Sequence, residues 1–169
     1  MNIGLDKRDE INDAYWETLT AFSFRKEISK KRLSTKRFRW CTRGEPFSTI
    51  YDVLKIRTIA LTCPEIDFWA PTRGWRNANI RDNIETYCFP IPNLFITASI
   101  DPSNTQQEIS TLVTNGWSTH FFGDDRQYPF ILPSKVIKCP AKWGDNITCM
   151  DCNVACYNPK QTHSWLKEH

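Results

Sequence analysis

Four cysteines near the carboxyl end have a spacing that can gather their thiolates around one metal centre. Cys139-Pro140 is followed by eight further residues and then by Cys149, Cys152 and Cys156, in the pattern C-P-x8-C-x2-C-x3-C. Cysteines that are two or three residues apart in a turn can direct their sulfur atoms to one point, and Cys139 can supply the fourth ligand from outside that turn. Thiolates suit zinc and iron–sulfur clusters alike. The sequence therefore predicts a metal centre on these four cysteines.

The identity of the metal stays open at this point. Zinc ribbons usually pair two C-x2-C knuckles with glycines, whereas this chain has a single knuckle that no glycine follows. A C-x2-C-x3-C run and a separate Cys-Pro are both elements of ferredoxin-type ligation. The pattern thus favours an iron–sulfur cluster, of the 4Fe–4S type, with zinc as the alternative. A third interpretation is a set of buried thiols that bind no metal.

The other cysteines and the histidines fit no ligand spacing. Cys63 and Cys88 lie at the ends of predicted helices beside apolar residues, so we expect them in the core. Cys41 ends a predicted strand and is also more typical of a core residue. His120 falls within a strand-like run, which indicates a core or surface residue rather than a ligand. His163 is close to the cysteine segment in sequence but matches no metal-binding spacing.

The elements that must position these groups follow from the apolar pattern. Residues 6–33 have apolar side chains at helical spacing, with Asp6 as a candidate N-cap. From residue 38 onward, short apolar runs alternate with helical patterns. We predict strands at 38–41, 66–70, 94–100, 117–122 and 136–137, and helices at 47–62 (capped by Ser48 or Thr49), 79–87 and 103–115.

Alternation of strands and helices at this spacing implies parallel strands with right-handed crossovers. Five predicted strands are too few to close an eight-stranded barrel. We therefore predict an α/β fold with an open, mostly parallel sheet or a partial (β/α) barrel, preceded by an N-terminal helix and followed by a cysteine-rich metal loop. The length of 169 residues fits one domain. Its segments are an N-terminal helix with a basic region (1–37), an α/β core (38–137) and a metal-binding tail (138–169).

Polar residues follow the predicted strands, where open parallel sheets bind their ligands. We predict a ligand-binding rim made of Arg43, Glu45, Thr72, Arg73, Ser99 and Asp101. Asp124 and Asp125 follow the fourth strand and could bind Mg²⁺ in an acid–base enzyme. Neighbouring acids in a turn are more often turn formers, so this enzyme hypothesis ranks third.

Basic residues are concentrated before and within the first predicted strand. Nine of them lie between Arg25 and Arg43, with Glu27 as the one acid among them. Such a patch can neutralise phosphates, which indicates a nucleic acid or nucleotide as partner. The alternative is a solvated surface, because runs of charge usually face water. The net charge of +3 is too small to decide between the two.

One stretch resembles the middle of a radical SAM barrel. In that superfamily a strand ending in Gly-Gly-Glu-Pro leads through a helix to a strand ending in Thr-Asn-Gly. In this sequence, Gly44-Glu45-Pro46 precedes a predicted helix and then a predicted strand that ends in Thr72-Arg73-Gly74. The resemblance implies that Glu45 helps to hold the amino group of S-adenosylmethionine. Radical SAM enzymes also carry C-x3-C-x2-C near the amino end, and this sequence departs from that pattern. Four cysteines on one cluster would leave no iron open for the cofactor.

A longer part of the chain is similar to a family of bacteriophage and plasmid proteins related to mycobacteriophage gene product 88. The similarity lies in the order of Arg39-Trp40, Gly44 to Ser48, Phe68 to Arg76, Pro92 to Leu94 and the cysteine motif at the end. It implies a phage-type origin and a metal-binding tail, and it implies no reaction. The leading hypothesis is a phage accessory protein with an iron–sulfur cluster that binds a nucleotide or nucleic acid. The alternative is a zinc-stabilised, non-catalytic module that captures a host protein.

The expected location is the host cytoplasm. The first ten residues are rich in charge and contain no apolar run, so we expect no signal peptide. No stretch approaches the roughly 20 apolar residues of a membrane span, so we expect no membrane partner. Seven cysteines cannot all pair in disulfides, which fits a reducing compartment. The sequence leaves the oligomeric state and the question of catalysis open.

Overall fold

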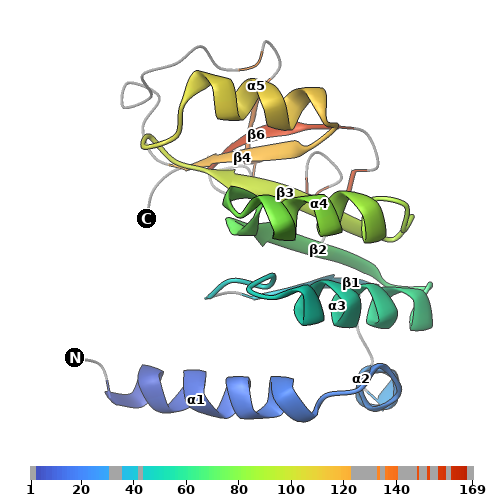
Figure 1. Cartoon of the computed structure of the whole chain (residues 1–169). Coiled ribbons are helices and arrows are strands. Elements are labelled where there is room, and N and C mark those ends of the chain that lie inside the picture. The colour runs from blue at the N-terminus through green and yellow to red at the C-terminus, as the bar shows by residue number, and fades with distance from the viewer. Residues whose placement is uncertain are drawn as a thin grey trace.

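A computed structural model of the chain describes residues 3–30, 36–41, 44–122, 133, 136–140, 148, 152, 156–158 and 161–166. Helices and strands alternate through most of this part of the chain (Figure 1). The elements are α1 (Ile3–Thr18), α2 (Ala21–Lys30), β1 (Arg37–Arg39), α3 (Ile50–Thr62), β2 (Asp67–Thr72), η1 (Gly74–Arg76), α4 (Ala78–Tyr87), β3 (Leu94–Ile100), α5 (Gln106–Thr114), β4 (Ser118–Phe122), β5 (Val136–Lys138) and β6 (His163–Leu166).

The six strands form one open sheet in the order β1-β2-β3-β4-β6-β5, and every neighbouring pair is parallel. β1 and β5 are the edge strands. The prediction of an open parallel sheet is confirmed. The sequence missed β6, which lies between β4 and β5 and so separates the fifth predicted strand from the fourth.

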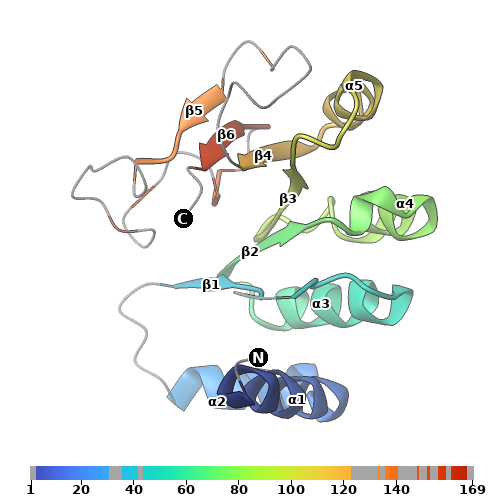
Figure 2. The same cartoon turned by 90° about the vertical axis from the view of Figure 1, so that its left-hand side faces the viewer.

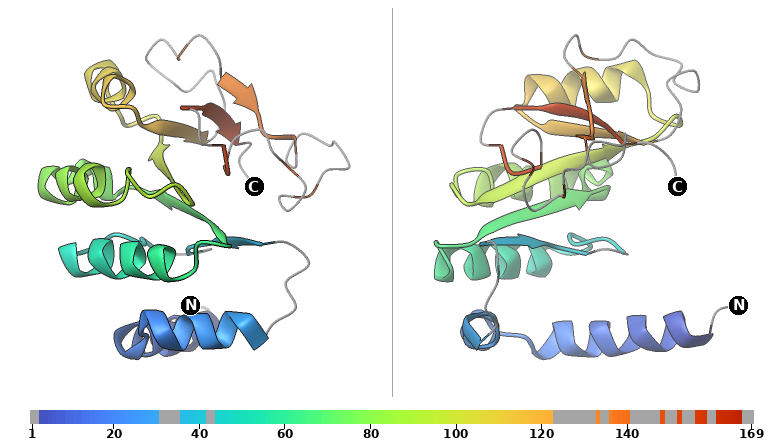
Figure 3. Two further views of the ribbon diagram at one scale, coloured as in Figure 1. Left: turned by 90° about the vertical axis from the view of Figure 1, so that its right-hand side faces the viewer. Right: turned by 180° about the vertical axis from the view of Figure 1, so that it is seen from behind.

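Helices α3, α4 and α5 cover one face of the sheet (Figure 2), and the views from the opposite side and from behind agree (Figure 3). Because side chains alternate along a strand, every second residue points toward these helices. Phe68, Ala70, Ile96, Ala98 and Phe121 do so and belong to the buried core. The helices contribute the apolar side chains of Ile56, Ile59, Ile84, Ile109 and Leu112. Cys63 and Cys88 are fully buried in the same core, as predicted.

Capping boxes fix where two of these helices begin. The Thr49 hydroxyl accepts from the backbone N–H of Asp52, whose carboxylate accepts from the Thr49 N–H over 2.8 Å. Thr49, rather than Ser48, is therefore the cap of α3. Thr105 and Glu108 form the same arrangement at the start of α5. Each box satisfies backbone N–H groups that have no partner inside the helix.

The prediction of one N-terminal helix over 6–33 is wrong for its described part. α1 ends at Thr18 and α2 begins at Ala21. Thr20 breaks the helix because its hydroxyl accepts from the Ser23 N–H over 3.1 Å and its own N–H donates to the Ser23 hydroxyl over 3.0 Å. Asp6 lies within α1, which begins at Ile3, so it is not the N-cap. Residues 31–35 lie outside the described part.

The helix pair is packed onto the α/β core. The Trp16 indole N–H donates to the Asp52 carboxylate over 2.8 Å, which joins α1 to the start of α3. Lys55 of α3 donates to the carbonyl of Trp16 and lies 4.4 Å from the centre of its ring. From α2, the Phe24 ring packs against Phe38 at 5.2 Å between centroids. Through these contacts, residues of α1 and α2 join the hydrophobic core beside β1, the edge strand.

Candidate functional site

The second face of the sheet, opposite α3, α4 and α5, carries a connected set of aromatic and basic side chains. Strand register places Arg39, Trp69 and Phe95 side by side on this face. The Trp69 indole N–H donates to the Thr97 hydroxyl over 2.9 Å. Its ring lies 5.2 Å from the imidazole of His120, and the Arg39 guanidinium lies 4.7 Å above it. Other residues of the chain cover this face, because Trp69 is only 4% exposed.

Three described residues of the cysteine segment, Cys152, Cys156 and Tyr157, lie against the second face. The ring of Tyr157 packs 6.3 Å from Trp69 and 6.2 Å from Phe95, between centroids. Arg37 of β1 lies 4.8 Å above the Tyr157 ring and donates to the carbonyl of Cys152 over 2.9 Å. Two predicted metal ligands, Cys152 and Cys156, are thus held against the sheet by residues from β1, β2 and β3.

Cys156 also meets a buried histidine. Its Sγ lies 4.0 Å from Nε2 of His120, which is 1% exposed in β4. Burial lowers the pKa of His120 to about 3, and the positive charge of Arg39 acts in the same direction, so the imidazole is neutral. The sequence left open whether His120 is a core or a surface residue, and the structure places it in the core. The sequence did not connect His120 with the cysteines. The available signal was a polar residue inside an otherwise buried strand.

The other two predicted ligands are placed differently. The backbone N–H of Cys139, just after β5, donates to the carbonyl of Trp165 in β6 over 2.9 Å, so Cys139 is two strands from His120. Cys149 lies outside the described residues. The structure records no disulfide among the six cysteines of the described part. Among the same residues, no three His, Cys, Asp or Glu side chains form a group able to hold a metal ion.

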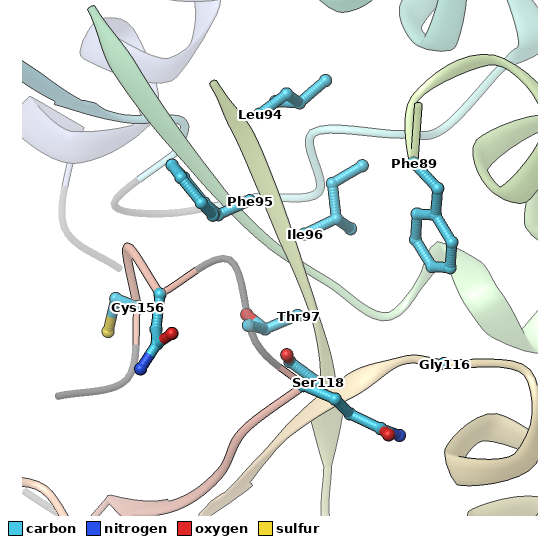
Figure 4. A pocket seen from close by; sticks show the side chains of 10 residues that line it. Phe89, Leu94, Phe95, Ile96, Thr97, Gly116, Ser118 and Cys156 are labelled. Atoms are coloured by element: carbon cyan, nitrogen blue, oxygen red, sulfur yellow. The ribbon is translucent and has the colours of Figure 1, made fainter. Parts of the chain in front are cut away.

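A cavity of about 170 Å³ borders Cys156 (Figure 4). It is lined by the starts of β3 and β4 and by the tail. Three of its polar side chains already have partners. The Thr97 hydroxyl accepts from Trp69, the Ser118 hydroxyl accepts from the Thr162 N–H over 3.1 Å, and Gln161 donates to two backbone carbonyls. This cavity is therefore poorly equipped to bind a polar ligand.

Several residues of the predicted ligand-binding rim meet at the carboxyl edge of the sheet, and Glu45 joins them. One carboxylate oxygen of Glu45 accepts from the Phe47 N–H over 3.0 Å and from the Thr72 hydroxyl. The other accepts from the Arg73 N–H over 2.6 Å. The structure thus brings together Glu45, Thr72 and Arg73, and it uses Glu45 to join the segments that follow β1 and β2.

Asp101 extends the rim beyond β3. Its carboxylate lies 2.8 Å from the guanidinium of Arg76 and 3.6 Å from that of Arg73. Burial by itself would raise the pKa of Asp101, but hydrogen bonds from Ser103 and Arg76 outweigh it, so the pKa lies below its ordinary value. Arg76 was not predicted, although its position soon after a strand was a usable signal.

The remaining predicted rim residues contribute less. Ser99 is 8% exposed, and its backbone carbonyl accepts from the Trp75 indole N–H over 3.1 Å. Arg43, Asp124 and Asp125 lie outside the described residues.

A groove of about 710 Å³ is lined by residues of α1, α2, β1 and the segment after β1. Trp16, Trp40, Cys41 and Glu45 are among the residues that line it. Cys41 has a left-handed backbone (φ 47°), a conformation that is uncommon for a residue other than glycine. Burial raises the pKa of its thiol, and the charges of Glu45 and Asp52 add to this effect. The Cys41 thiol is therefore protonated and a weak nucleophile.

The basic residues of the predicted patch divide between two places. Arg37 and Arg39 lie on the second face and contact aromatic rings there. Arg25 of α2 donates to the carbonyl of Thr62 over 2.6 Å, and Lys30 pairs with Glu27 at 3.2 Å. Residues 31–35 and Arg43 lie outside the described part.

Comparison with protein-family models gives a match. The sequence model of the family described as gene product 88 matches residues 7–122. The chain belongs to this family of phage proteins. The matched region runs from α1 to β4 and includes His120 and the rim, and it ends before the cysteines of the tail.

The other comparisons add no relatives. No curated protein and no solved structure matches the chain. The similarity to the middle of a radical SAM barrel receives no support from them. Within the described part of the chain, no helix has the length and apolar character needed to cross a membrane.

Proposed function

We propose that this member of the gene product 88 family is a metal-binding accessory protein that acts in the host cytoplasm. Cys139, Cys149, Cys152 and Cys156 hold its metal centre, which is an iron–sulfur cluster with zinc as the alternative. The centre fastens the tail onto the second face of the sheet. When bound, an iron–sulfur cluster supplies electron transfer or structural support, and zinc supplies structural support alone.

One observation carries this proposal: two cysteines of the C-x2-C-x3-C motif meet the second face of the sheet. The Cys152 carbonyl accepts from Arg37, and the Cys156 Sγ lies 4.0 Å from the buried imidazole of His120. The chemistry of the surroundings also fits. A centre with four thiolates is anionic, and the guanidinium groups of Arg37 and Arg39 on this face can offset its charge.

Metal analysis of the whole chain, purified without oxygen, tests the proposal. Iron with acid-labile sulfide and visible charge-transfer absorption is the expected result. One zinc ion per chain without sulfide supports the alternative, a non-catalytic module that captures a host protein. A chain that contains neither metal and that takes up neither on reconstitution contradicts the proposal.

Binding of a nucleotide or nucleic acid is a second candidate function. It is favoured by the exposed guanidinium groups at the carboxyl edge of the sheet. The side chains of Arg73 and Arg76 are 58% and 39% exposed, and both guanidinium groups lie near the same oxygen of Asp101. Arginine binds phosphate through paired N–H groups, and this edge is where parallel sheets bind ligands.

Fluorescence anisotropy with a labelled oligonucleotide and a labelled nucleotide tests this second function. Binding should weaken with added salt, because neutralised phosphates release counterions. Arg73→Gln should weaken binding, whereas Arg57→Gln on α3 should not. Equal binding by the two variants, or none by the wild type, would remove this candidate.

A further inference from the structure

His120 is a buried imidazole whose position calls for a chemical explanation. It lies in the middle of β4, it is 1% exposed, and its ring packs 5.2 Å from Trp69. Its nitrogen atoms make no hydrogen bond to the described residues of the core or of the rim. Buried polar atoms in proteins are nearly always hydrogen-bonded, so an exception indicates a special role.

The two ring nitrogens of His120 have different surroundings. Nε2 faces the Sγ of Cys156 at 4.0 Å, while Nδ1 has no hydrogen-bond partner in the part of the chain that the structure describes. A neutral imidazole carries one proton, on one of these atoms. A buried N–H without an acceptor is costlier than a lone pair without a donor. The proton therefore belongs on Nε2, where it points at the sulfur.

We infer that His120 donates its Nε2–H to the Cys156 thiolate and is a positioning residue of the metal centre. The inference rests on the proposed metal-binding function. A metal-bound thiolate is a far better acceptor than a thiol because it carries negative charge. The bond orients the Cys156 side chain toward the metal and stabilises the charge on its sulfur.

Direct metal ligation by His120 is the competing role. A histidine that binds a metal through one nitrogen almost always donates the N–H of the other nitrogen to a carboxylate, a carbonyl or a water. The unpartnered Nδ1 of His120 lacks such an acceptor among the described residues. The surroundings of the ring therefore favour an N–H donor over a ligand.

Three variants of the whole chain test the role. His120→Leu removes the donor and keeps an apolar filling. His120→Gln places an amide N–H near the position of Nε2. Ser164→Ala is the matched control, because Ser164 pairs with His120 in register and is 1% exposed, and its hydroxyl has no hydrogen-bond partner among the described residues.

Zinc affinity, measured by competition with a chromophoric chelator, should fall by about 10–100-fold in His120→Leu. His120→Gln should recover most of the loss, and Ser164→Ala should bind like the wild type. If the chain holds an iron–sulfur cluster, His120→Leu should also lower its reduction potential, because the lost N–H stabilises the more negative reduced state. Wild-type affinity and potential in His120→Leu would overturn the inference.

A measurement on the wild type keeps the test independent of how the variants fold. Nitrogen-15 NMR of the histidine side chains, with cadmium-113 loaded as the metal, should show a proton on Nε2 of His120. A scalar coupling between cadmium and a nitrogen of His120 would show direct ligation and overturn the donor role. A chain that binds no metal would instead overturn the proposed function, so the two failures are distinguishable.

Discussion

The backbone N–H of Arg73 donates a hydrogen bond of 2.6 Å to Oε2 of Glu45. Glu45 follows β1, and Arg73 follows β2, so this bond fastens two neighbouring segments at the carboxyl edge of the sheet. Oε1 of Glu45 accepts from the Phe47 N–H and the Thr72 hydroxyl. The carboxylate that the sequence predicted as a ligand-binding group is thus engaged by its own chain at both oxygens.

Glu45→Ala should lower the free energy of unfolding by about 2 kcal/mol, because it leaves several donors of the rim without their acceptor. The Thr72 hydroxyl is the most affected, since Thr72 is 1% exposed. Urea denaturation measures the loss. Glu65→Ala is the control, because Glu65 is exposed in the turn before β2 and should change stability by less than about 0.5 kcal/mol. Equal stability of the two variants would show that the rim does not depend on Glu45.

Asn93→Asp should be strongly destabilising. The Asn93 side-chain amide donates to the carbonyls of Ala60, Cys63 and Ile66 over 3.1, 3.1 and 2.8 Å, and the residue is 8% exposed. An aspartate there has no N–H to donate and places a negative charge beside three carbonyl oxygens. We expect a loss of about 3 kcal/mol or more in the free energy of unfolding at neutral pH.

The matched control for Asn93→Asp is Asn79→Asp. Asn79 is exposed in the first turn of α4, where a negative charge is favourable. Its stability, measured by the same denaturation, should stay within about 0.5 kcal/mol of the wild type. A small effect of Asn93→Asp would mean that the three carbonyls find other donors.

The parts of the fold that were predicted well have strong local signals. The strand over 94–100 is an unbroken run of apolar and small residues, and β3 has these bounds. The strand β6 was missed because His163 and Ser164 break its apolar pattern, and its place depends on pairing with β4 and β5, which are distant in sequence. The helix break at Thr20 had a local signal, because Ser23 follows Thr20 by three residues. The helical spacing of the apolar residues nevertheless favoured one continuous helix.

The candidate site divides in the same way. Local spacing predicted that Cys149, Cys152 and Cys156 form a group, and this stays a prediction because Cys149 lies outside the described residues. Strand ends predicted the residues of the rim, and the structure brings Glu45, Thr72 and Arg73 together there. His120 could not be found by spacing, because 36 residues separate it from Cys156 and only the order of strands brings the two together. For the same reason, Arg37 offered no hint that it would donate to the Cys152 carbonyl 115 residues away.

The capping box of α5 predicts a pH dependence. The backbone N–H of Thr105, foremost among several hydrogen bonds, holds the pKa of Glu108 below its ordinary value of 4.5. A carboxylate with a lowered folded pKa contributes stability above the unfolded pKa, and this is lost as the pH falls through the folded pKa. Glu108→Gln should therefore be less stable than the wild type at pH 7, by about 0.5 kcal/mol.

The difference between wild type and Glu108→Gln should shrink below pH 4.5 and vanish once Glu108 is protonated in the folded state. Urea denaturation of both proteins between pH 7 and pH 3 measures it. A difference that stays constant over this range would show that the charge of Glu108 has no part in the cap.

Cys152→Ser should release the tail from the sheet. A structural metal centre contributes its binding free energy to folding, so loss of one thiolate should unfold the last roughly 30 residues. The chain should lose its metal, and trypsin should cleave the lysines after β5 faster than in the wild type. The hydrogen bond from Arg37 to the Cys152 carbonyl depends on the backbone alone, so it cannot compensate for the missing thiolate.

Cys41→Ser is the control for this experiment, because Cys41 is half-buried beside β1 and outside the cysteine motif. It should keep both the metal and the protease resistance of the tail. If Cys152→Ser retains the metal and resists trypsin as well as Cys41→Ser does, the contacts of Tyr157, the Arg37 hydrogen bond and the pairing of β6 hold the tail without the Cys152 thiolate. A metal centre on the four cysteines would then be wrong, because removing one thiolate ligand must weaken it.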